Sequence, residues 1–253
     1  MTGWDNRQYL KFADERTRAA SELLARVPLA SADHVVDLGC GPGNSTAVLR
    51  ARFPAAHLTG VDSSADMLER ARKDYPELSW RLADAAAFSP EQPLDLLFAN
   101  ALLQWLPEHA SLVPTLFSRV APGGVLALQM PRNFEEPSHR LMRSTPGPWA
   151  DRLAGVRSLT PVASPAFYYD LLAPTARSVD IWQTTYEHVM QSPEAIVDWV
   201  KGTGLRPYLE ALSASERDTY LAAYTRGIDA AYPPRSDGKR LFSFPRLFIV
   251  AQR

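Results

Sequence analysis

The stretch HVVDLGCGPGN, residues 34–44, decides the fold class of this chain. Its first half, residues 35–38, is apolar apart from one acid and predicts a short buried strand. Three glycines follow within five residues: Gly39, Gly41 and Gly43. Glycines allow a sharp turn and let a ligand approach bare backbone. The stretch therefore predicts a strand that delivers a binding loop.

Short apolar runs recur after this one, in the segments HLTGVD, LSWRLAD, LDLLFANA and GGVLALQM. Each is separated from the next by a segment of helical or loop character, and this alternation predicts a parallel, doubly wound sheet with right-handed crossovers. The segments SVDIWQTTYEHVM and RLFSFPRLFIVAQR predict two further strands. We therefore predict an α/β fold with a Rossmann-like sheet of seven strands.

We expect a single domain over residues 1–253 with three additions to the sheet. Residues 1–28 predict an N-terminal helix that caps the core and ends at a proline. Residues 131–177 carry many prolines and predict a loop-rich excursion with short helices. Residues 191–235 predict a helical insertion between strands six and seven, which we interpret as a lid over a site.

Two helix starts can be placed within this insertion. Ser192 is a suitable N-cap, with Pro193 at the first helical position. Ser213 and Glu216 have the spacing of a capping box. The insertion is therefore predicted to hold two helices.

The composition points to small-molecule partners. With 27 basic and 28 acidic side chains the net charge is -1, which offers no support for binding nucleic acid or an anionic membrane. Cys40 is the only cysteine, and no apolar run predicts a signal peptide or a membrane span, so we expect a cytoplasmic protein. The five histidines lack metal-ligand spacing, and no metal site is predicted. The oligomeric state stays open.

The glycine loop differs from a dinucleotide-binding loop in two ways. A G-x-G-x-x-G fingerprint needs a glycine where this chain has Asn44, and Asp37 lies two residues before the first glycine. A carboxylate repels a diphosphate but accepts hydrogen bonds from a cationic amine. We therefore predict that Asp37, Gly39, Gly41 and Asn44 bind a ligand that carries an ammonium group.

Acids also end the second and third predicted strands. Asp62 is placed to accept hydrogen bonds from both hydroxyls of a ribose. Asp84 can accept from an adenine amino group, and the backbone N–H of Ala85 can donate to a ring nitrogen. Each acid alone could instead be a helix cap or a turn residue. Together with the loop they predict S-adenosylmethionine, which carries an amine, a ribose and an adenine but no phosphate.

The run VVDLGCGPGN resembles the first motif of the class I methyltransferases, hhDhGCGxG. Further segments resemble the bacterial trans-aconitate 2-methyltransferases, from the N-terminal helix to the last residues. They include LARVPL, GVDSSADMLERAR, LDLLFANALLQWLPEH, GVLALQMPRNFEEPSH, DWVKGTGLRPYL and FPRLFIVAQR. The resemblance implies transfer of the methyl group of S-adenosylmethionine to one carboxylate of trans-aconitate. The products are a monomethyl ester and S-adenosylhomocysteine.

The resemblance also implies roles for individual residues. In related enzymes an N-terminal helix closes over the cofactor, which assigns Arg16 to the methionine carboxylate and Tyr9 to the reacting centre. The alternative is an amphipathic helix that only caps the core. Asn100 and Trp105 follow the fourth strand, where relatives contact the methionine portion and the substrate. Trp105 could equally be a core residue.

Ser63 and Met67 lie in the matching segment GVDSSADMLERAR and complete the predicted cofactor set.

A carboxylate is ionised at neutral pH, so its methylation needs no general base. The site must instead hold a polycarboxylate, for which arginine forks are suited. Arg246 lies within an aromatic face of the last strand, where the alternative is a structural ion pair. Arg206 lies in the predicted lid, where a solvated loop arginine is the alternative. Asn133 and His139 follow the fifth strand, with a surface histidine as the alternative for His139.

Three other functions stay open at this stage. A methyltransferase of the same fold could act on another small acid, or on an amine or carbon nucleophile, which would require a base. The chain could also bind the cofactor without performing chemistry. A nicotinamide dehydrogenase is disfavoured by Asp37 and Asn44.

Overall fold

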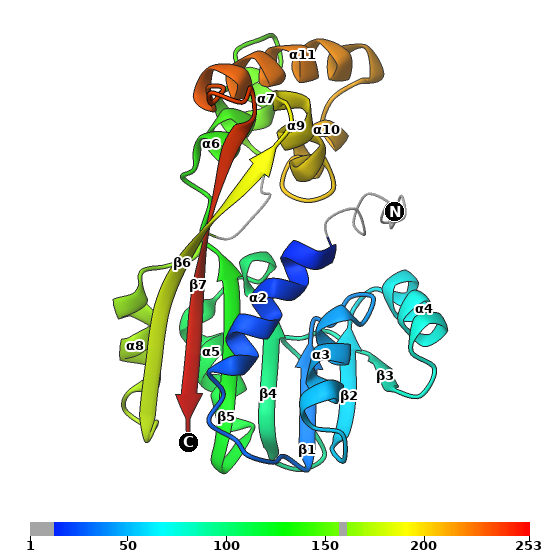
Figure 1. Ribbon diagram of the computed structural model, residues 1–253, viewed down its shortest axis with the longest axis vertical. Coiled ribbons are helices and arrows are strands. Elements are labelled where there is room, and N and C mark those ends of the chain that lie inside the picture. Colours follow the sequence, from blue (N-terminus) through cyan, green and yellow to red (C-terminus); the bar gives the residue numbers. More distant parts are fainter. Residues whose placement is uncertain (1–12, 157–160) are drawn as a thin grey trace.

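The structure, a computed structural model, describes residues 13–156 and 161–253, with side chains described from Thr17 onward. The described residues form a seven-stranded sheet in the order β3-β2-β1-β4-β5-β7-β6 (Figure 1). The strands are β1 His34–Leu38, β2 His57–Asp62, β3 Ser79–Leu82, β4 Leu94–Asn100, β5 Val120–Pro131, β6 Ser178–Met190 and β7 Arg240–Gln252. The predicted α/β fold with a doubly wound sheet is confirmed.

Strands β1 to β5 pair in parallel, and β7 pairs antiparallel with both β5 and β6. The central strands β1 and β4 are buried, which explains why their segments are nearly continuous apolar runs. Their carboxyl ends meet at one edge of the sheet. The glycine loop after β1 and the ends of β2 and β4 are therefore brought together by the topology.

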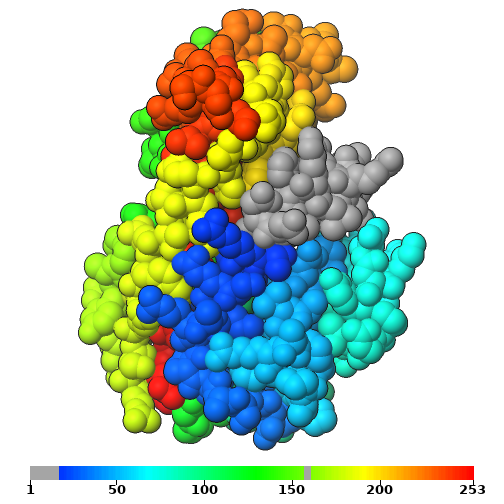
Figure 2. Space-filling view, in the orientation of Figure 1, coloured from blue at the N-terminus to red at the C-terminus, as the bar shows by residue number. Residues whose placement is uncertain are grey.

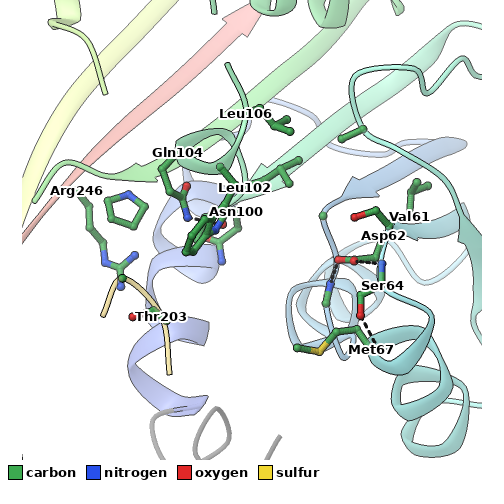
Figure 3. Close-up of a pocket in the computed structure, with 18 of the residues that line it drawn as sticks. Val61, Asp62, Ser64, Met67, Asn100, Leu102, Gln104, Leu106, Thr203 and Arg246 are labelled. Atoms are coloured by element: carbon green, nitrogen blue, oxygen red, sulfur yellow. Dashed lines mark hydrogen bonds between the residues drawn. The ribbon is translucent and has the colours of Figure 1, made fainter. Parts of the chain in front are cut away.

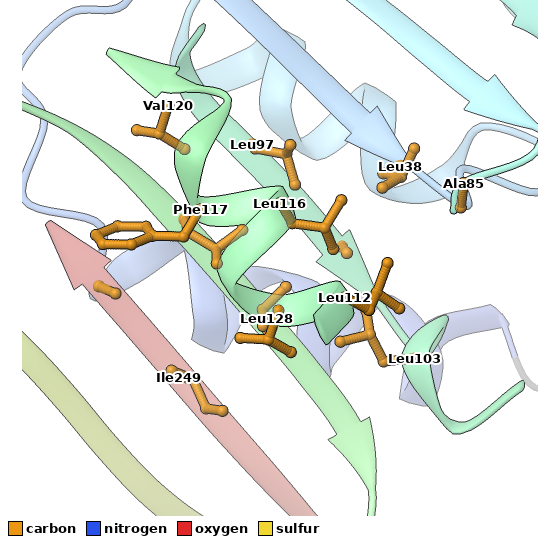
Figure 4. Packing of buried hydrophobic residues seen from close by; sticks show 14 of the residues in the cluster. Leu38, Ala85, Leu97, Leu103, Leu112, Leu116, Phe117, Val120, Leu128 and Ile249 are labelled. Atoms are coloured by element: carbon orange, nitrogen blue, oxygen red, sulfur yellow. The ribbon is translucent and has the colours of Figure 1, made fainter. Parts of the chain in front are cut away.

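Helices cover both faces of the sheet. One face is covered by α2 (Ala13–Ala25) and α3 (Asn44–Arg52), and the other by α5 (His109–Ser118) and α8 (Pro165–Leu172). Helix α4 (Ala65–Asp74) contacts β2 and β3, and the short helix η1 (Leu103–Trp105) follows β4. Figure 4 shows α5 presenting Leu112, Leu116 and Phe117 to the strand residues Leu128 and Ile249. These two apolar layers fix the sheet beneath its ligand edge.

Strands β6 and β7 extend beyond the rest of the sheet. They pair with each other from Ser178↔Gln252 to Met190↔Arg240, whereas β5 pairs with β7 only as far as Pro131↔Arg246. Past Arg246 the two strands continue as a two-stranded ribbon, visible in Figure 1 above the sheet. Arg246 therefore lies where the ribbon leaves the sheet.

The ribbon carries a second group of helices, here named the helical module. Its members are α6 Pro137–Ser144, α7 Ala150–Ala154, α9 Pro193–Lys201, α10 Arg206–Glu210 and α11 Ala214–Ala231. The module has an apolar core of its own, in which Trp149, Trp199 and Tyr220 pack with Phe242 of the ribbon. Figures 1 and 2 show the module as a separate lobe above the sheet.

The local signals for helix starts in the insertion are confirmed. Ser192 caps α9, and its Oγ accepts a hydrogen bond from the Ala195 N–H at 3.3 Å. Ser213 and Glu216 form the predicted capping box at the start of α11. The insertion between β6 and β7 also holds α10. The part of the predicted N-terminal helix before residue 13 lies outside the described residues.

Candidate active site

A cavity of about 440 Å³ lies between the ligand edge of the sheet and the helical module. Of the predicted cofactor residues, those that line it are Gly39, Gly41, Asp62, Ser63, Met67, Asp84, Ala85, Asn100 and Trp105. Of the predicted substrate residues, those that line it are Trp105, Asn133, His139 and Arg246. Figure 3 shows Asp62, Ser64 and Met67 on one side of the space, with Asn100, Gln104 and Arg246 on the other. The cavity thus has an acidic half and a basic half.

Asp62 connects the glycine loop to the start of α4. Its Oδ2 accepts a hydrogen bond from the Gly41 N–H at 2.8 Å, and its Oδ1 accepts one from the Ser64 N–H at 2.8 Å. Ser64 in turn caps α4 through the Met67 N–H. A carboxylate can accept more than one bond at each oxygen, so Asp62 retains capacity for hydroxyl donors in the cavity.

The glycine loop requires glycine at its first position. Gly39 has a φ of +74°, and a Cβ added there would lie 2.7 Å from Cδ1 of Leu102. The N–H groups of Gly39 and Cys40 both donate to the carbonyl oxygen of Val61, at 2.7 and 3.1 Å. The loop is therefore fixed to β2 while its backbone lines the cavity.

The segment after β3 holds the other predicted acid. Asp84 Oδ1 accepts a hydrogen bond from the Ala86 N–H at 2.8 Å, which shapes a tight turn. Asp84 and Ala85 both line the cavity, with Ala85 buried. This geometry is compatible with the predicted contacts to an adenine edge.

Two buried amide oxygens, on the last residue of β4 and on η1, have no hydrogen-bond donor within the described part of the chain. Among the described residues no hydrogen-bond donor meets Oδ1 of Asn100 or Oε1 of Gln104, although both atoms are buried and both residues line the cavity. Gln104 Nε2 donates to the Ala101 carbonyl oxygen at 2.6 Å, which directs its oxygen elsewhere. Buried acceptors are normally satisfied. An ammonium group is a donor of the kind that these two oxygens lack, so the residues are compatible with the predicted S-adenosylmethionine.

Asp37 occupies a different position from the predicted one. It is fully buried and does not line the cavity. Its Oδ2 accepts hydrogen bonds from Ser45 Oγ at 2.7 Å and Thr46 Oγ1 at 2.6 Å. Burial raises the pKa of Asp37 to about 6, while the two hydroxyls act in the opposite direction. The carboxylate thus holds the start of α3 beneath the loop, which differs from the expected contact with an ammonium group.

Arg246 forms the wall of the basic half. Its side chain is 3% exposed and lines the cavity. The guanidinium carbon lies 4.7 Å from the ring centre of Phe244 and 5.4 Å from that of Tyr186, and Nη1 donates to Oε1 of Gln129 at 3.4 Å. A cation in such a low-dielectric wall strongly favours an anion in the adjoining space.

Asn133 and His139 are buried beside Arg246 in the cavity lining. Burial, together with the positive charge of Arg143, lowers the pKa of His139 to about 4. His139 is therefore neutral at pH 7 and can donate one N–H. Its Nδ1 lies 3.2 Å from Ser138 Oγ.

The helical module adds lining residues that the sequence did not reveal. They are Trp199 of α9 and, in the turn before α10, Thr203 and Gly204. A Cβ on Gly204 would lie 3.0 Å from Nε2 of His139, so this turn packs closely on the histidine. The sequence GTG at residues 202–204 allows the backbone to lie this close to His139, but nothing in the sequence indicates that His139 is the partner.

Besides Asp37, two described residues of the predicted site, Arg206 and Asn44, do not line the cavity, and two more lie outside the described side chains. Arg206 begins α10, and its Nε donates to Glu210 Oε1 at 2.7 Å, a pairing within one helix turn. Asn44 is the first residue of α3. Tyr9 lies outside the described residues. Arg16 belongs to α2, and its side chain lies outside the described part of the chain.

Within residues 13–156 and 161–253 no three His, Cys, Asp or Glu side chains gather as a metal site would require. The same part of the chain contains no helix with the length and apolar character of a membrane span.

The chain is similar to proteins of one family along its whole length. A family model described as methyltransferase domain matches residues 35–124. A trans-aconitate 2-methyltransferase of Azoarcus sp. (strain BH72) is 66% identical over 253 residues, which cover 100% of both chains. A protein of the same name from Methylobacterium radiotolerans is 56% identical, over 100% of this chain and 99% of its own.

Solved structures share the fold. The YcgJ protein of Bacillus subtilis matches with a TM-score of 0.60 at 14% identity, over 93% of this chain and 98% of its own. Phosphoethanolamine N-methyltransferase 2 of Haemonchus contortus, solved with S-adenosyl-L-methionine, matches with a TM-score of 0.56 at 14% identity, over 97% of this chain and 57% of its own. At these identities the likeness establishes the fold alone.

The full-length relatives, the methyltransferase-domain match and the seven-stranded sheet agree with one another. The glycine loop, Asp62 and the two unmet amide oxygens lie where this fold binds its cofactor. The chain therefore belongs to the trans-aconitate 2-methyltransferase family of S-adenosylmethionine-dependent methyltransferases.

Proposed function

We propose that this protein methylates one carboxylate of trans-aconitate and releases a monomethyl ester and S-adenosylhomocysteine. Relatives that bear the corresponding name are 66% and 56% identical over the full chain. The structural observation that carries the proposal is the buried Arg246, which lines the same cavity as Asp62. A cofactor half and an anion-binding half are thereby joined in one space.

The cofactor supplies, when bound, an electrophilic methyl group on a sulfonium. In our proposal Asp62 accepts hydrogen bonds from the ribose hydroxyls, and Asp84 with Ala85 contacts the adenine. The amide oxygens of Asn100 and Gln104 accept from the ammonium group. Five further members of the predicted cofactor set line the cavity: Gly39, Gly41, Ser63, Met67 and Trp105. Arg16 stays in the proposed set on the family resemblance and Asn44 on the loop motif, whereas Asp37 supports the loop from beneath.

Three side chains of the chain suit a polycarboxylate. Arg246 anchors one carboxylate, while Asn133 and the neutral His139 donate hydrogen bonds to the rest of the acid. Tyr9 and Trp105 stay in the proposed substrate set on the resemblance, whereas Arg206 pairs with Glu210 outside the cavity lining. Trp199 and Phe244 supply apolar walls that exclude water.

Methylation of a carboxylate requires the protein to orient the two reactants and does not require a general base. A carboxylate is already ionised at pH 7, and His139 is neutral there because its pKa is lowered to about 4. Correct orientation of two reactants contributes on the order of 7 to 11 kcal/mol. The chain supplies this by fixing Arg246 on a paired strand and Asp62 through two backbone hydrogen bonds. We further propose that the helical module acts as a lid on the cavity.

The proposal is tested by methyl transfer from labelled S-adenosylmethionine to trans-aconitate, cis-aconitate, citrate and isocitrate, with the ester identified by mass spectrometry. We expect preferential labelling of trans-aconitate. Binding of S-adenosylhomocysteine without labelling of any acid would refute the proposed substrate class. Preferential labelling of another acid would refute trans-aconitate as the substrate.

A further inference from the structure

A buried glutamine stands behind Arg246. Gln129 is fully buried on β5, where it pairs with Asn100 of β4 on one side and with Phe248 of β7 on the other. Paired residues of neighbouring strands share a face, and Arg246 shares the face of Phe248 because the two are two residues apart. Gln129 therefore lies between Asn100, at the end of β4, and Arg246 on the same face of the sheet.

The hydrogen bonding of Gln129 is dictated by Arg246. A guanidinium only donates, so the amide must present its oxygen, and Oε1 accepts from Arg246 Nη1 at 3.4 Å. Among the described residues no acceptor meets the buried Nε2 of Gln129. An apolar side chain would pack among Ala127 and Phe248 without leaving this polar atom unsatisfied. Packing alone therefore does not account for an amide at this position, and its one side-chain partner among the described residues is Arg246.

We propose that Gln129 is a positioning residue for Arg246, and that its lack of charge is the essential property. It orients the guanidinium with an acceptor that adds no negative charge beside it. A carboxylate at this position would pair with Arg246 in a low-dielectric environment and compete with the substrate. The inference rests on the proposed function because the ligand is taken to be a polycarboxylate.

A purely structural role for Gln129 predicts a different ranking of the glutamate and methionine variants at this position. If the amide served only to satisfy the buried arginine, Gln129→Glu would preserve the acceptor and Gln129→Met would remove it. The methionine variant would then be the more damaged of the two. If neutrality matters, the glutamate variant is the more damaged in substrate affinity, even where its fold is at least as stable.

The chain contains a matched control for these substitutions. Gln183 on β6 also accepts from an arginine, with its Oε1 2.9 Å from Nη1 of Arg132, and it does not line the cavity. The four variants Q129E, Q129M, Q183E and Q183M are compared with wild type. The readouts are KM and kcat for trans-aconitate, Kd for S-adenosylhomocysteine, and Tm.

We expect Q129E to raise KM roughly tenfold or more and Q129M about threefold, because the first opposes the charge of Arg246 and the second only frees its orientation. The Kd for S-adenosylhomocysteine and both Gln183 variants should match wild type. A KM for Q129E at or below that of Q129M overturns the inference. An equal loss of cofactor affinity in Q129E also overturns it.

A double-mutant cycle provides a second test that does not require Q129E to fold. If Gln129 acts through Arg246, Q129M should have no further effect on KM in an Arg246→Met background. A threefold effect of Q129M that persists in that background would contradict the inference.

Equilibrium binding separates this inference from the proposed function. Calorimetry with trans-aconitate and citrate, in the presence of S-adenosylhomocysteine, should give the same order of affinities: wild type, then Q129M, then Q129E. If the three proteins bind these anions in that order but wild type methylates neither, the proposed function is refuted and the role of Gln129 is supported. A wild-type protein that binds neither anion overturns both.

Discussion

Replacing Arg246 by methionine removes the positive charge from the substrate half of the cavity while keeping an unbranched side chain. The side chain is 3% exposed, so solvent does little to screen its attraction to an anion. One charge-assisted hydrogen bond contributes about 1.5 to 3 kcal/mol. That range corresponds to a loss of about 10-fold to 150-fold in kcat/KM for trans-aconitate.

The same substitution should leave cofactor binding and stability intact. Arg246 lies across the cavity from Asp62, so we expect an unchanged Kd for S-adenosylhomocysteine. Exchange of a buried charged group for an apolar one of similar size is often neutral or stabilising, and Tm should therefore equal or exceed that of wild type. Steady-state kinetics with labelled S-adenosylmethionine, calorimetry and thermal melting measure the three quantities.

Arg206→Met is the comparison that makes the result specific. Arg206 pairs with Glu210 within α10, and such partly exposed pairs contribute only about 0.2 to 1 kcal/mol. We expect its kcat/KM for trans-aconitate to stay within about fivefold of wild type. Equal losses in substrate turnover and cofactor affinity for Arg246→Met would refute the assignment of Arg246. So would a larger loss of turnover in the Arg206 variant.

Three further outcomes are expected. Asp62→Ala should raise the Kd for S-adenosylhomocysteine roughly 10-fold to 100-fold by calorimetry, because two hydroxyl acceptors and the anchor of the loop are lost; an unchanged Kd would exclude the ribose role. Gly39→Ala should lower Tm by several degrees, since its φ is +74° and its Cβ would meet Leu102; an unchanged Tm would show that the loop relaxes freely. The pKa of His139 is lowered to about 4 in the folded state, so the stability it contributes is present above its unfolded pKa of about 6.5 and is lost as pH falls. Between pH 7 and pH 5 wild type should therefore lose about 2 kcal/mol more unfolding free energy than His139→Gln, measured by urea denaturation, and parallel curves would contradict this.

The cofactor half of the site could be predicted from the sequence because its signals are local. A strand that ends in glycines and later strands that end in acids must meet at one edge of a parallel sheet. That Asp62 and Asp84 line one cavity could therefore be predicted without knowing how distant parts of the chain pack. The caps at Ser192 and Ser213 are local in the same sense, since each depends on residues within one turn.

Asp37 shows the limit of reasoning from a motif. Its position before the glycines suggested a ligand contact, but the outcome depends on two hydroxyls of α3. Ser45 and Thr46 take the same carboxylate oxygen from within the fold. Only the course of the loop shows that the side chain points beneath it.

The substrate half was harder to predict because it depends on the β6–β7 ribbon. Trp199 and Thr203 come from a module that is placed over the sheet only by the length of two antiparallel strands. Gln129 reads in the sequence as one polar residue in a core strand. Its relation to Arg246 follows from strand register and not from any motif.

In the proposed reaction, the positive charge of Arg246 has a role distinct from that of the apolar walls of the cavity. A carboxylate and a sulfonium carry opposite charges that are partly cancelled as the methyl group moves, so a water-poor, apolar setting favours the transition state over the separated reactants. Trp199 and Phe244 supply such a setting. A cation paired with the reacting carboxylate would stabilise it before transfer and so slow the step. Arg246 is therefore better suited to anchor a carboxylate that does not react, which explains why a substrate with several carboxylates fits this cavity.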